Sequence, residues 1–271
     1  YGPANTRGAI RGKDYVGVLA GVDNGATVEN IFIKYDVSGE NYVGSLAGKK
    51  SAGSVVRSAS RFLVSGKENV GGLVGFLGEA SVTDCYSIAN VSGTKNIGGL
   101  VGSSDKAIVK NSFAAGQVVG DSKWGGLAGS DNKSTYTSVY YDTTLWYVNT
   151  TAAGDLRNTT EMVKKENYEG WDFDSTWKIA ADSTYPYLSW LTKPYYISKT
   201  MKEKIYPNQA VDQTMMKMAG SGTEKDPFLI KTYGDLKSIG FGKYKLSSVY
   251  RLANDIDATA SKTDPHFAVD D

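Results

Sequence analysis

The sequence contains very few of the residues from which most catalytic and metal sites are built. Its 271 residues include one histidine, His266, and one cysteine, Cys85. Because His266 stands among the last six residues, we exclude a Ser-His-Asp triad, a Cys–His pair and a histidine-rich zinc site. A single cysteine also excludes an intrachain disulfide, and it permits an extracytoplasmic protein without requiring one.

Excess charge and long apolar runs are missing as well. Lys and Arg number 30 against 29 Asp and Glu, so the net charge of +1 gives no reason to expect nucleic acid or an anionic membrane as partner. No stretch approaches 18 uncharged apolar residues, so we expect no membrane span. Only 6 prolines accompany 31 glycines and 18 tyrosines, a composition typical of a turn-rich β protein.

What the sequence does contain is a short glycine–leucine phrase that recurs at a constant interval. The five copies are Val16–Gly21, Val43–Gly48, Val70–Gly75, Ile97–Gly102 and Trp124–Gly129. Their starting positions, 16, 43, 70, 97 and 124, differ by 27 each time. Such a repeat without insertion or deletion indicates units, called coils below, that stack in register as a solenoid.

Each coil reads as three short extended pieces separated by glycine or small polar residues, and no window shows a helical period. Identical pieces of successive coils would pair as parallel strands with a rise of about 4.8 Å per coil. Parallel crossovers are overwhelmingly right-handed. The expected fold class is therefore all-β, a right-handed parallel β-solenoid of about five coils.

Several columns of equivalent positions have a defined place in this fold. The leucines of the phrase would stack in the interior, and its first glycines would leave room for tight corners. These leucines are Leu19, Leu46, Leu73, Leu100 and Leu127. A second set of glycines, expected to adopt left-handed turns, is Gly39, Gly66, Gly93 and Gly120.

A polar column is expected at one corner of each coil. Its members are Asn30, Arg57, Asp84, Asn111 and Ser138. We interpret it as a stacked ladder that satisfies turn amides, with a binding stripe as the alternative. Cys85 shares its column with Ser58 and Ser112, which predicts a small buried side chain and not a reactive thiol.

The third coil resembles a known family. Val70–Gly75, Val82-Thr-Asp-Cys-Tyr86 and Val91-Ser-Gly93 resemble the GLUG motif, a short Gly-Leu-(Val/Ala)-Gly repeat of bacterial surface and secreted proteins. Asp84 replaces the usual Asn, and the first two copies of the phrase have Val18 and Ser45 at the second glycine. The resemblance implies a non-enzymatic β-solenoid, extracellular or on the cell surface, that acts as an adhesin or scaffold. Its partner would be a host or matrix glycoprotein, a polysaccharide or another surface protein.

Two later segments look like the flanks of such repeat modules. Residues 156–190 resemble a closing segment, whose bulky rings would cover the apolar end of the solenoid and its free strand edges. These rings are Trp171, Phe173, Trp177, Tyr185 and Tyr187, and a sugar-binding platform is their alternative role. Residues 220–257 resemble the opening segment of another module, with a short helix expected to begin over 235–239.

The domain organisation expected from these resemblances has three parts. Residues 1–191 form the solenoid with its closing cap, residues 192–219 connect, and residues 220–271 open a second module. Because Ile10–Gly12 matches Val37–Gly39 one step earlier, the chain begins in mid-coil and is interpreted as a stretch of a longer array.

The main alternative function is that of a polysaccharide-processing β-helix enzyme, a lyase or glycosidase. Glu29, Arg57, Asp84 and Lys110 are candidates for lining its groove, although a solvated charged face is the simpler interpretation. A further alternative is the non-catalytic stalk of a larger surface protease, since the His-Glu-x-x-His helix is absent. No cofactor is expected.

Two candidate sites remain. Asp255 and Asp257, beside Asn254, have oxygen ligands that suit calcium, although the same run fits a structural role. The aromatic stretch after the last phrase contains Tyr141, Trp146 and Tyr147, which would stack on sugars or pack on a partner protein if they face solvent. If they face inward, these rings close the last coil.

Overall fold

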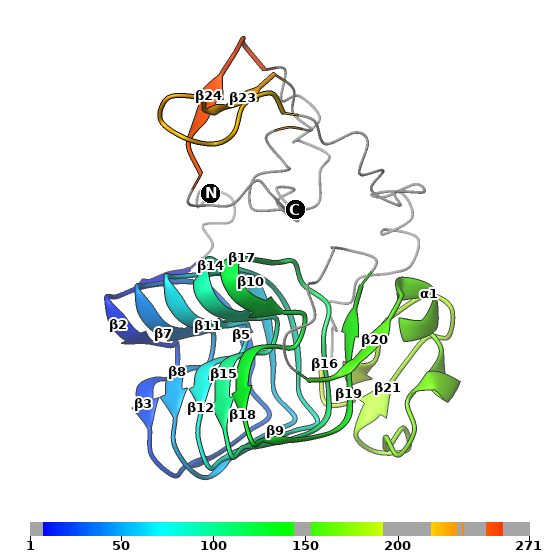
Figure 1. Ribbon diagram of the computed structural model, residues 1–271. Coiled ribbons are helices and arrows are strands. Elements are labelled where there is room, and N and C mark those ends of the chain that lie inside the picture. Colours follow the sequence, from blue (N-terminus) through cyan, green and yellow to red (C-terminus); the bar gives the residue numbers. More distant parts are fainter. Residues whose placement is uncertain (1–7, 144–152, 192–217, 232–234, 236–247, 257–271) are drawn as a thin grey trace, which may run out of the picture. The chain divides into compact units, whose positions relative to one another are not determined.

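The computed structural model describes residues 8–143, 153–191, 218–231, 235 and 248–256 (Figure 1). The chain divides into two compact units, one of residues 6–199 and one of residues 200–271 together with 1–5. The repeats belong to the first unit.

The first unit is a parallel β-solenoid, as the repeat predicts. In the second coil, the strands are β7 (Asn41–Gly44), β8 (Ala47–Lys50), β9 (Ser54–Val56) and β10 (Ala59–Ser65). They pair in parallel with β11 (Glu68–Gly71), β12 (Val74–Leu77), β13 (Ser81–Thr83) and β14 (Tyr86–Gly98) of the next coil. Every partner stands 27 residues away, as Val43 and Val70 do, so the register follows the sequence interval.

The remaining coils continue the same columns. Before the second coil lie β1 (Ala9–Arg11), β2 (Asp14–Val16), β3 (Ala20–Asp23), β4 (Thr27–Glu29), β5 (Phe32–Lys34) and β6 (Asp36–Ser38). After the third lie β15 (Val101–Asp105), β16 (Ile108–Ala114), β17 (Val118–Gly125), β18 (Ala128–Asn132) and β19 (Thr135–Asp142). The second coil has four strands where three extended pieces were expected, because a corner divides the glycine–leucine phrase between two strands, as between β7 and β8.

Two corners of each coil are made by non-glycine residues in the left-handed region. The expected polar corner is confirmed, with φ between +44° and +56° at Asn30, Arg57, Asp84, Asn111 and Ser138. The second corner stands one residue before the phrase. Its left-handed residues are Tyr15, Tyr42, Asn69, Asn96 and Lys123.

The prediction of left-handed turns at the second set of glycines is wrong. The left-handed glycines among the described residues are Gly53, Gly154, Gly170, Gly220 and Gly222. Gly66 is needed for space instead, because a Cβ there would lie 2.8 Å from Cγ2 of Val70. Gly93 has the same relation to Ile97, whose Cδ1 would lie 2.6 Å away. These glycines make room for the valine and isoleucine of the next phrase.

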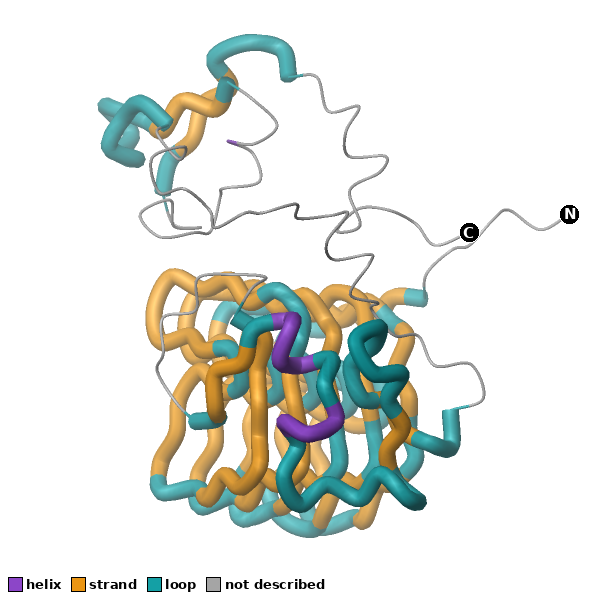
Figure 2. The backbone as a smooth tube through the Cα atoms, turned by 90° about the vertical axis from the view of Figure 1, so that its right-hand side faces the viewer, coloured by secondary structure: helices purple, strands orange, loops and turns teal. Residues whose placement is uncertain are grey.

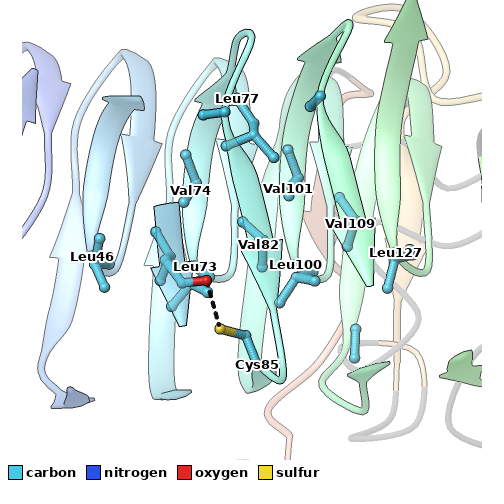
Figure 3. Packing of buried hydrophobic residues seen from close by; sticks show 14 of the residues in the cluster. Leu46, Leu73, Val74, Leu77, Val82, Cys85, Leu100, Val101, Val109 and Leu127 are labelled. Atoms are coloured by element: carbon cyan, nitrogen blue, oxygen red, sulfur yellow. Dashed lines mark hydrogen bonds between the residues drawn. The ribbon is translucent and has the colours of Figure 1, made fainter. Parts of the chain in front are cut away.

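The leucine ladder fills the interior, with one exception. Leu46, Leu73, Leu100 and Leu127 are fully buried and pack with Val74, Val82, Val101 and Val109 (Figure 3). Leu19 was expected in the same stack but is 50% exposed. It lies in the first coil, and no described residue adds a further leucine on its outer side.

The flank segment, defined as residues 153–191, does not close the end of the solenoid as expected. It contains β20 (Asp155–Arg157), α1 (Thr159–Met162), the 3-10 turn η1 (Lys165–Asn167), β21 (Trp177–Lys178) and β22 (Tyr187–Leu188). Only β20 extends the last coil, by pairing with β19. The remainder runs over the side of the stack (Figure 2).

Aromatic packing and indole hydrogen bonds fix the flank segment across several coils. Its rings pack on an outward-facing column of largely aromatic residues. The buried members of this column are Ala59, Tyr86, Phe113 and Tyr140. Indole Nε1 donates from Trp190 to the carbonyl of Arg57 at 3.0 Å, from Trp177 to Oδ1 of Asp84 at 3.3 Å, and from Trp171 to the carbonyl of Ser138 at 3.1 Å. The expected bulky cover therefore exists, but it covers the outer face of a sheet. This face is apolar because Tyr86, Phe113 and Tyr140 follow one another in its column.

The described part of the second unit is small. Strands β23 (Phe228–Ile230) and β24 (Tyr250–Leu252) pair in parallel, and Met218, Phe228 and Ile230 are buried together. Of the helix expected over 235–239, only Asp235 lies within the described residues. Across the described chain, no helix is long and apolar enough to cross a membrane.

Candidate binding surface

The predicted binding residues do not form an exposed aromatic site among the described residues. Tyr141 is 4% exposed and packs in the interior cluster with Leu127 and Val139. It faces inward because Gly126 opposite has no side chain, and a Cβ there would lie 2.0 Å from the Tyr141 ring. Trp146 and Tyr147 lie outside the described residues. Of the two interpretations of this stretch, closing the last coil holds for Tyr141.

Three of the four residues proposed to line the alternative catalytic groove make structural contacts. Arg57 Nη2 lies 2.6 Å from Oε2 of Glu29, and its Nε donates to Oδ1 of Asn30 at 3.1 Å. Asp84 accepts the indole N–H of Trp177 in the flank segment. Glu29 thus pairs with a guanidinium and Asp84 with an indole, while Lys110 is exposed.

The corner amides are satisfied differently from the prediction. The amides of the polar column itself donate to backbone carbonyls of the next coil, as Arg57 does to Thr83 at 3.1 Å. The amides that follow donate to the side chains of the Cys85 column instead. These bonds run from Ile31 to Ser58 Oγ at 3.2 Å, from Ser58 to Cys85 Sγ at 3.4 Å and from Cys85 to Ser112 Oγ at 3.1 Å. The prediction of a small buried side chain at Cys85 is confirmed.

The candidate calcium site lies only partly within the described residues. Asn254 donates through Nδ2 to the carbonyls of Lys231 and Asp255, and Asp257 lies outside the described residues. Within the described ranges, no group of three or more His, Cys, Asp or Glu side chains could hold a metal ion.

An exposed aromatic surface occurs elsewhere, on the first three coils. The rings of Tyr15 and Tyr42 stack with centroids 4.8 Å apart and planes within 2° of parallel. Phe76 meets Tyr42 edge-on at 6.2 Å, and Nζ of Lys49 lies over the Phe76 ring at 5.5 Å. With Val22, which is 45% exposed, these four residues form a surface that we call the aromatic seam.

The aromatic seam lies where two strand columns meet. Tyr15 and Tyr42 come from the column of β2, β7 and β11, and the other three residues come from β3, β8 and β12, all on the left of Figure 1. The last glycine of each phrase allows the close approach of the two columns. A Cβ on Gly48 would lie 2.5 Å from the carbonyl oxygen of Tyr42 and 2.6 Å from the carbonyl carbon of Tyr15.

The two stacked tyrosine rings keep the spacing of the coils from which they come. Their centroids are 4.8 Å apart, which matches the ordinary spacing of neighbouring strands, about 4.8 Å. Tyr15 is 41% exposed and Tyr42 is partly exposed.

The same two columns become polar in later coils. Asn69 and Asn96 take the place of the tyrosines, and Ser103 takes the place of Phe76. Asn69 Oδ1 accepts hydrogen bonds from Nδ2 of Asn96 at 2.9 Å and from Oγ of Ser103 at 2.7 Å. One line along the stack thus passes from aromatic rings to amides and hydroxyls.

Sequence reasoning missed the aromatic seam, although a signal was present. Tyr15 and Tyr42 stand one residue before successive copies of the phrase and are separated by 27 residues. Extending the column comparison by one position reveals the pair. Phe76 could not be assigned to them from the sequence, because its contact depends on which strand columns adjoin.

Comparison with protein-family models identifies one of these coils. Residues 66–92 match the family model described as the GLUG motif. The third coil is a GLUG motif. This confirms the resemblance on the residues that carry it, and the GLUG motif with its β-solenoid fold fits a surface-type β-helix protein. No curated protein and no solved structure matches the chain.

The structure explains the GLUG signature in physical terms. Within the motif, Leu73 is the buried ladder residue and Cys85 is the acceptor for the corner amide of Ser58. Gly71 is required because a Cβ there would lie 2.0 Å from the carbonyl oxygen of Val74. At these three positions the motif therefore encodes the stacking of coils.

Proposed function

We propose that this chain is a non-enzymatic β-solenoid of the bacterial cell surface or secreted fraction, acting in adhesion or as an extracellular scaffold. The observation that supports this most directly is the unbroken parallel stack, which holds surface side chains at the strand spacing of about 4.8 Å along one axis. Such an array presents an extended, repetitive surface, as other solenoids do for their partners.

The charged surface of the stack supports a structural role for its carboxylates. Ion pairs join adjacent coils at 2.6–3.1 Å. They are Arg57–Glu29, Lys67–Glu40, Lys95–Glu68 and Lys106–Glu79. Exposed pairs of this kind contribute little to stability. Their main effect is to neutralise charges that would repel along the columns, which leaves these carboxylates engaged and not free for acid–base chemistry.

Adhesion is tested with beads coated with the intact chain. The beads are offered to surfaces carrying matrix glycoprotein or polysaccharide, with heat-unfolded chain on matched beads as control. We expect retention of the native beads alone. Equal retention of native and unfolded beads, or of neither, contradicts the proposed role.

The non-enzymatic part is tested separately. The intact chain is incubated with a panel of polysaccharides, and new reducing ends and unsaturated products are measured. We expect none. Product release that tracks the folded protein contradicts a purely adhesive or scaffolding role, and antibody labelling of intact cells tests the surface location.

A further inference from the structure

We propose that Asn24 is a site of spontaneous deamidation, and that the carboxylate of Asp23 controls the rate of this reaction in the folded protein. The inference goes beyond the proposed function, because it concerns a chemical change in the chain itself. Asn24 and Gly25 lie in the exposed turn between β3 and β4. They are the single Asn-Gly pair in the sequence.

The order of residues in this turn favours attack of the backbone on the asparagine side chain. The backbone nitrogen of Gly25 attacks Cγ of Asn24, the bond from Cγ to the side-chain nitrogen breaks, and that nitrogen leaves as ammonia with the proton of the Gly25 amide. Water then opens the succinimide ring at either carbonyl and gives aspartate or isoaspartate. Glycine leaves the attacking nitrogen unshielded, because it has no Cβ.

The turn has room for the ring and access to water. Asn24 and Gly25 are both exposed, and a Cβ built on Gly25 would have nothing within 4 Å. The last coil offers a comparison, because Asn132 occupies the same column as Asn24 but is followed by Lys133, which has a Cβ beside its nitrogen. Nδ2 of Asn132 also donates to Oδ1 of Asp105 at 2.7 Å. The reactive combination is therefore particular to the first coil.

Asp23 holds the attacking nitrogen in place. Its Oδ1 accepts hydrogen bonds from the backbone N–H of Gly25 at 3.0 Å and of Ala26 at 2.9 Å, and its Oδ2 lies 2.6 Å from the buried Nζ of Lys50. The N–H of Gly25 must leave this carboxylate before its nitrogen can turn toward Cγ of Asn24. Because hydrogen bonds to a charged acceptor are among the stronger ones, the folded turn should react about ten- to hundredfold more slowly than the unfolded chain.

The second coil anchors the carbonyl side of the same turn. The carbonyl of Ala26 accepts from Nζ of Lys50 at 2.8 Å and from the amide of Ser54 at 3.1 Å. Gly53 approaches so closely that a Cβ there would lie 2.5 Å from the carbonyl oxygen of Gly25. Isoaspartate inserts the side-chain methylene of residue 24 into the backbone beside these anchors. Deamidation should therefore loosen the pairing of the first coil with the second.

The test follows Asn24 in the intact chain at pH 8, both folded and unfolded in urea. Peptide mass spectrometry measures the loss of the amide, and an isoaspartate-specific methyltransferase assay measures the product. We expect Asn24 to convert in both states, about tenfold or more faster in the unfolded chain, and Asn132 to convert far more slowly than Asn24. Conversion confined to the unfolded chain, or found in neither state, overturns the site, and equal rates in the two states overturn the control by Asp23.

The role of the glycine is tested with a variant that keeps the fold. Gly25→Ala places a Cβ beside the attacking nitrogen, where no atom lies within 4 Å, so the thermal midpoint should not fall. Conversion of Asn24 should slow about tenfold, equivalent to about 1.4 kcal/mol in the barrier. If Gly25→Ala converts as fast as the parent, attack by this nitrogen is not the route by which Asn24 changes.

The role of Asp23 is tested against a matched background. Lys50→Met keeps the two amide bonds of Asp23, and adding Asp23→Ala to it removes the carboxylate without leaving a buried ammonium unpaired. Circular dichroism establishes that both variants are folded. The double variant should then convert Asn24 about tenfold or more faster than Lys50→Met alone. Equal rates in these two variants show that Asp23 does not control the reaction.

Discussion

The backbone N–H of Ser58 donates a hydrogen bond to the thiol of Cys85, one coil further along the stack, at 3.4 Å. The thiol in turn donates to the carbonyl of Thr83 at 3.2 Å. Ser58 and Ser112 make the same two contacts with their hydroxyls in the neighbouring coils. The cysteine of the GLUG motif therefore acts as a hydrogen-bonding member of a hydroxyl column.

This relationship predicts that Cys85 tolerates serine but not alanine. Cys85→Ala leaves the buried amide of Ser58 without its acceptor, which should cost about 1–3 kcal/mol of unfolding free energy. Cys85→Ser supplies a hydroxyl acceptor like those of Ser58 and Ser112, so the unfolding free energy of this variant should lie closer to that of the parent. Urea unfolding followed by circular dichroism measures both. If the alanine and serine variants are equally stable, the hydrogen bond contributes nothing to the stability of the fold.

Burial also makes the contribution of the Cys85 thiol to stability depend on pH. It raises the pKa of Cys85 to about 12, with Asp84 adding to the rise, whereas an unfolded thiol has a pKa of about 8.5. The thiol of the native protein therefore stays protonated to a higher pH than the thiol of the unfolded chain. The contribution of Cys85 to stability is full below about pH 8.5 and is lost as the pH rises toward 12.

Two measurements check this direction. The stability of the parent relative to Cys85→Ser should fall between pH 8 and pH 11, and alkylation of the native thiol at pH 8 should be no faster than global unfolding. Rapid alkylation of folded protein shows that Cys85 is accessible, contrary to its complete burial.

The stacking could be predicted from sequence because every coil repeats the same local physics. Leu46, Leu73 and Leu100 occupy one column, and a ladder of identical apolar side chains is stable only when coils stack in register. The interval of 27 residues therefore carried over directly into strand pairing.

What escaped prediction depends on contacts between columns. The left-handed corner before each phrase was not predicted, because its column begins with Tyr15 and Tyr42 and tyrosine has no preference for that region. The flank segment reaches back to Arg57 across 133 residues, and no local pattern encodes that distance. The aromatic seam likewise needs Phe76 to lie beside Tyr42, which follows only from the folded columns.

The leucine ladder predicts a contrast between equivalent positions. Leu73→Ala should cost about 2–5 kcal/mol, because a fully buried side chain leaves a cavity. Leu19→Ala should cost about 1 kcal/mol or less, since Leu19 is already half exposed. Leu73→Asp should prevent stable folding by placing an unpaired charge in the core. Comparable losses at positions 19 and 73 in thermal unfolding would show that the ladder register is wrong.

Glycines of the phrase and of the turns should respond in opposite ways to alanine. A Cβ on Gly98 would lie 1.9 Å from the carbonyl oxygen of Val101, so Gly98→Ala should cost about 1–3 kcal/mol or more. Gly25 has nothing within 4 Å of its Cβ position and no left-handed φ. Gly25→Ala should therefore be neutral or stabilise by about 0.4–1 kcal/mol. A neutral Gly98→Ala would mean that the corner is looser than described.

The buried ion pair between the first two coils predicts acid sensitivity. Nζ of Lys50 is fully buried and lies 2.6 Å from Oδ2 of Asp23, and it also donates to the carbonyl of Ala26 at 2.8 Å. Burial raises the pKa of Asp23, but hydrogen bonds from Lys50 and from the amides of Gly25 and Ala26 lower it more. The carboxylate therefore stabilises the fold above its unfolded pKa of about 3.9, and this contribution is lost as the pH falls below that value.

Removing either partner of this pair should have unequal effects. Asp23→Asn leaves a buried ammonium without its counter-ion and should cost about 3–5 kcal/mol at pH 7. Lys50→Met should cost less, because the next coil has Leu77 at this position and Asp23 keeps its two amide donors. The Lys50→Met variant should also lose less stability than the parent between pH 5 and pH 3, with Lys49→Met as the partly exposed control that behaves like the parent. If Lys50→Met is as acid-sensitive as the parent, the pair does not account for the acid response of the first coils.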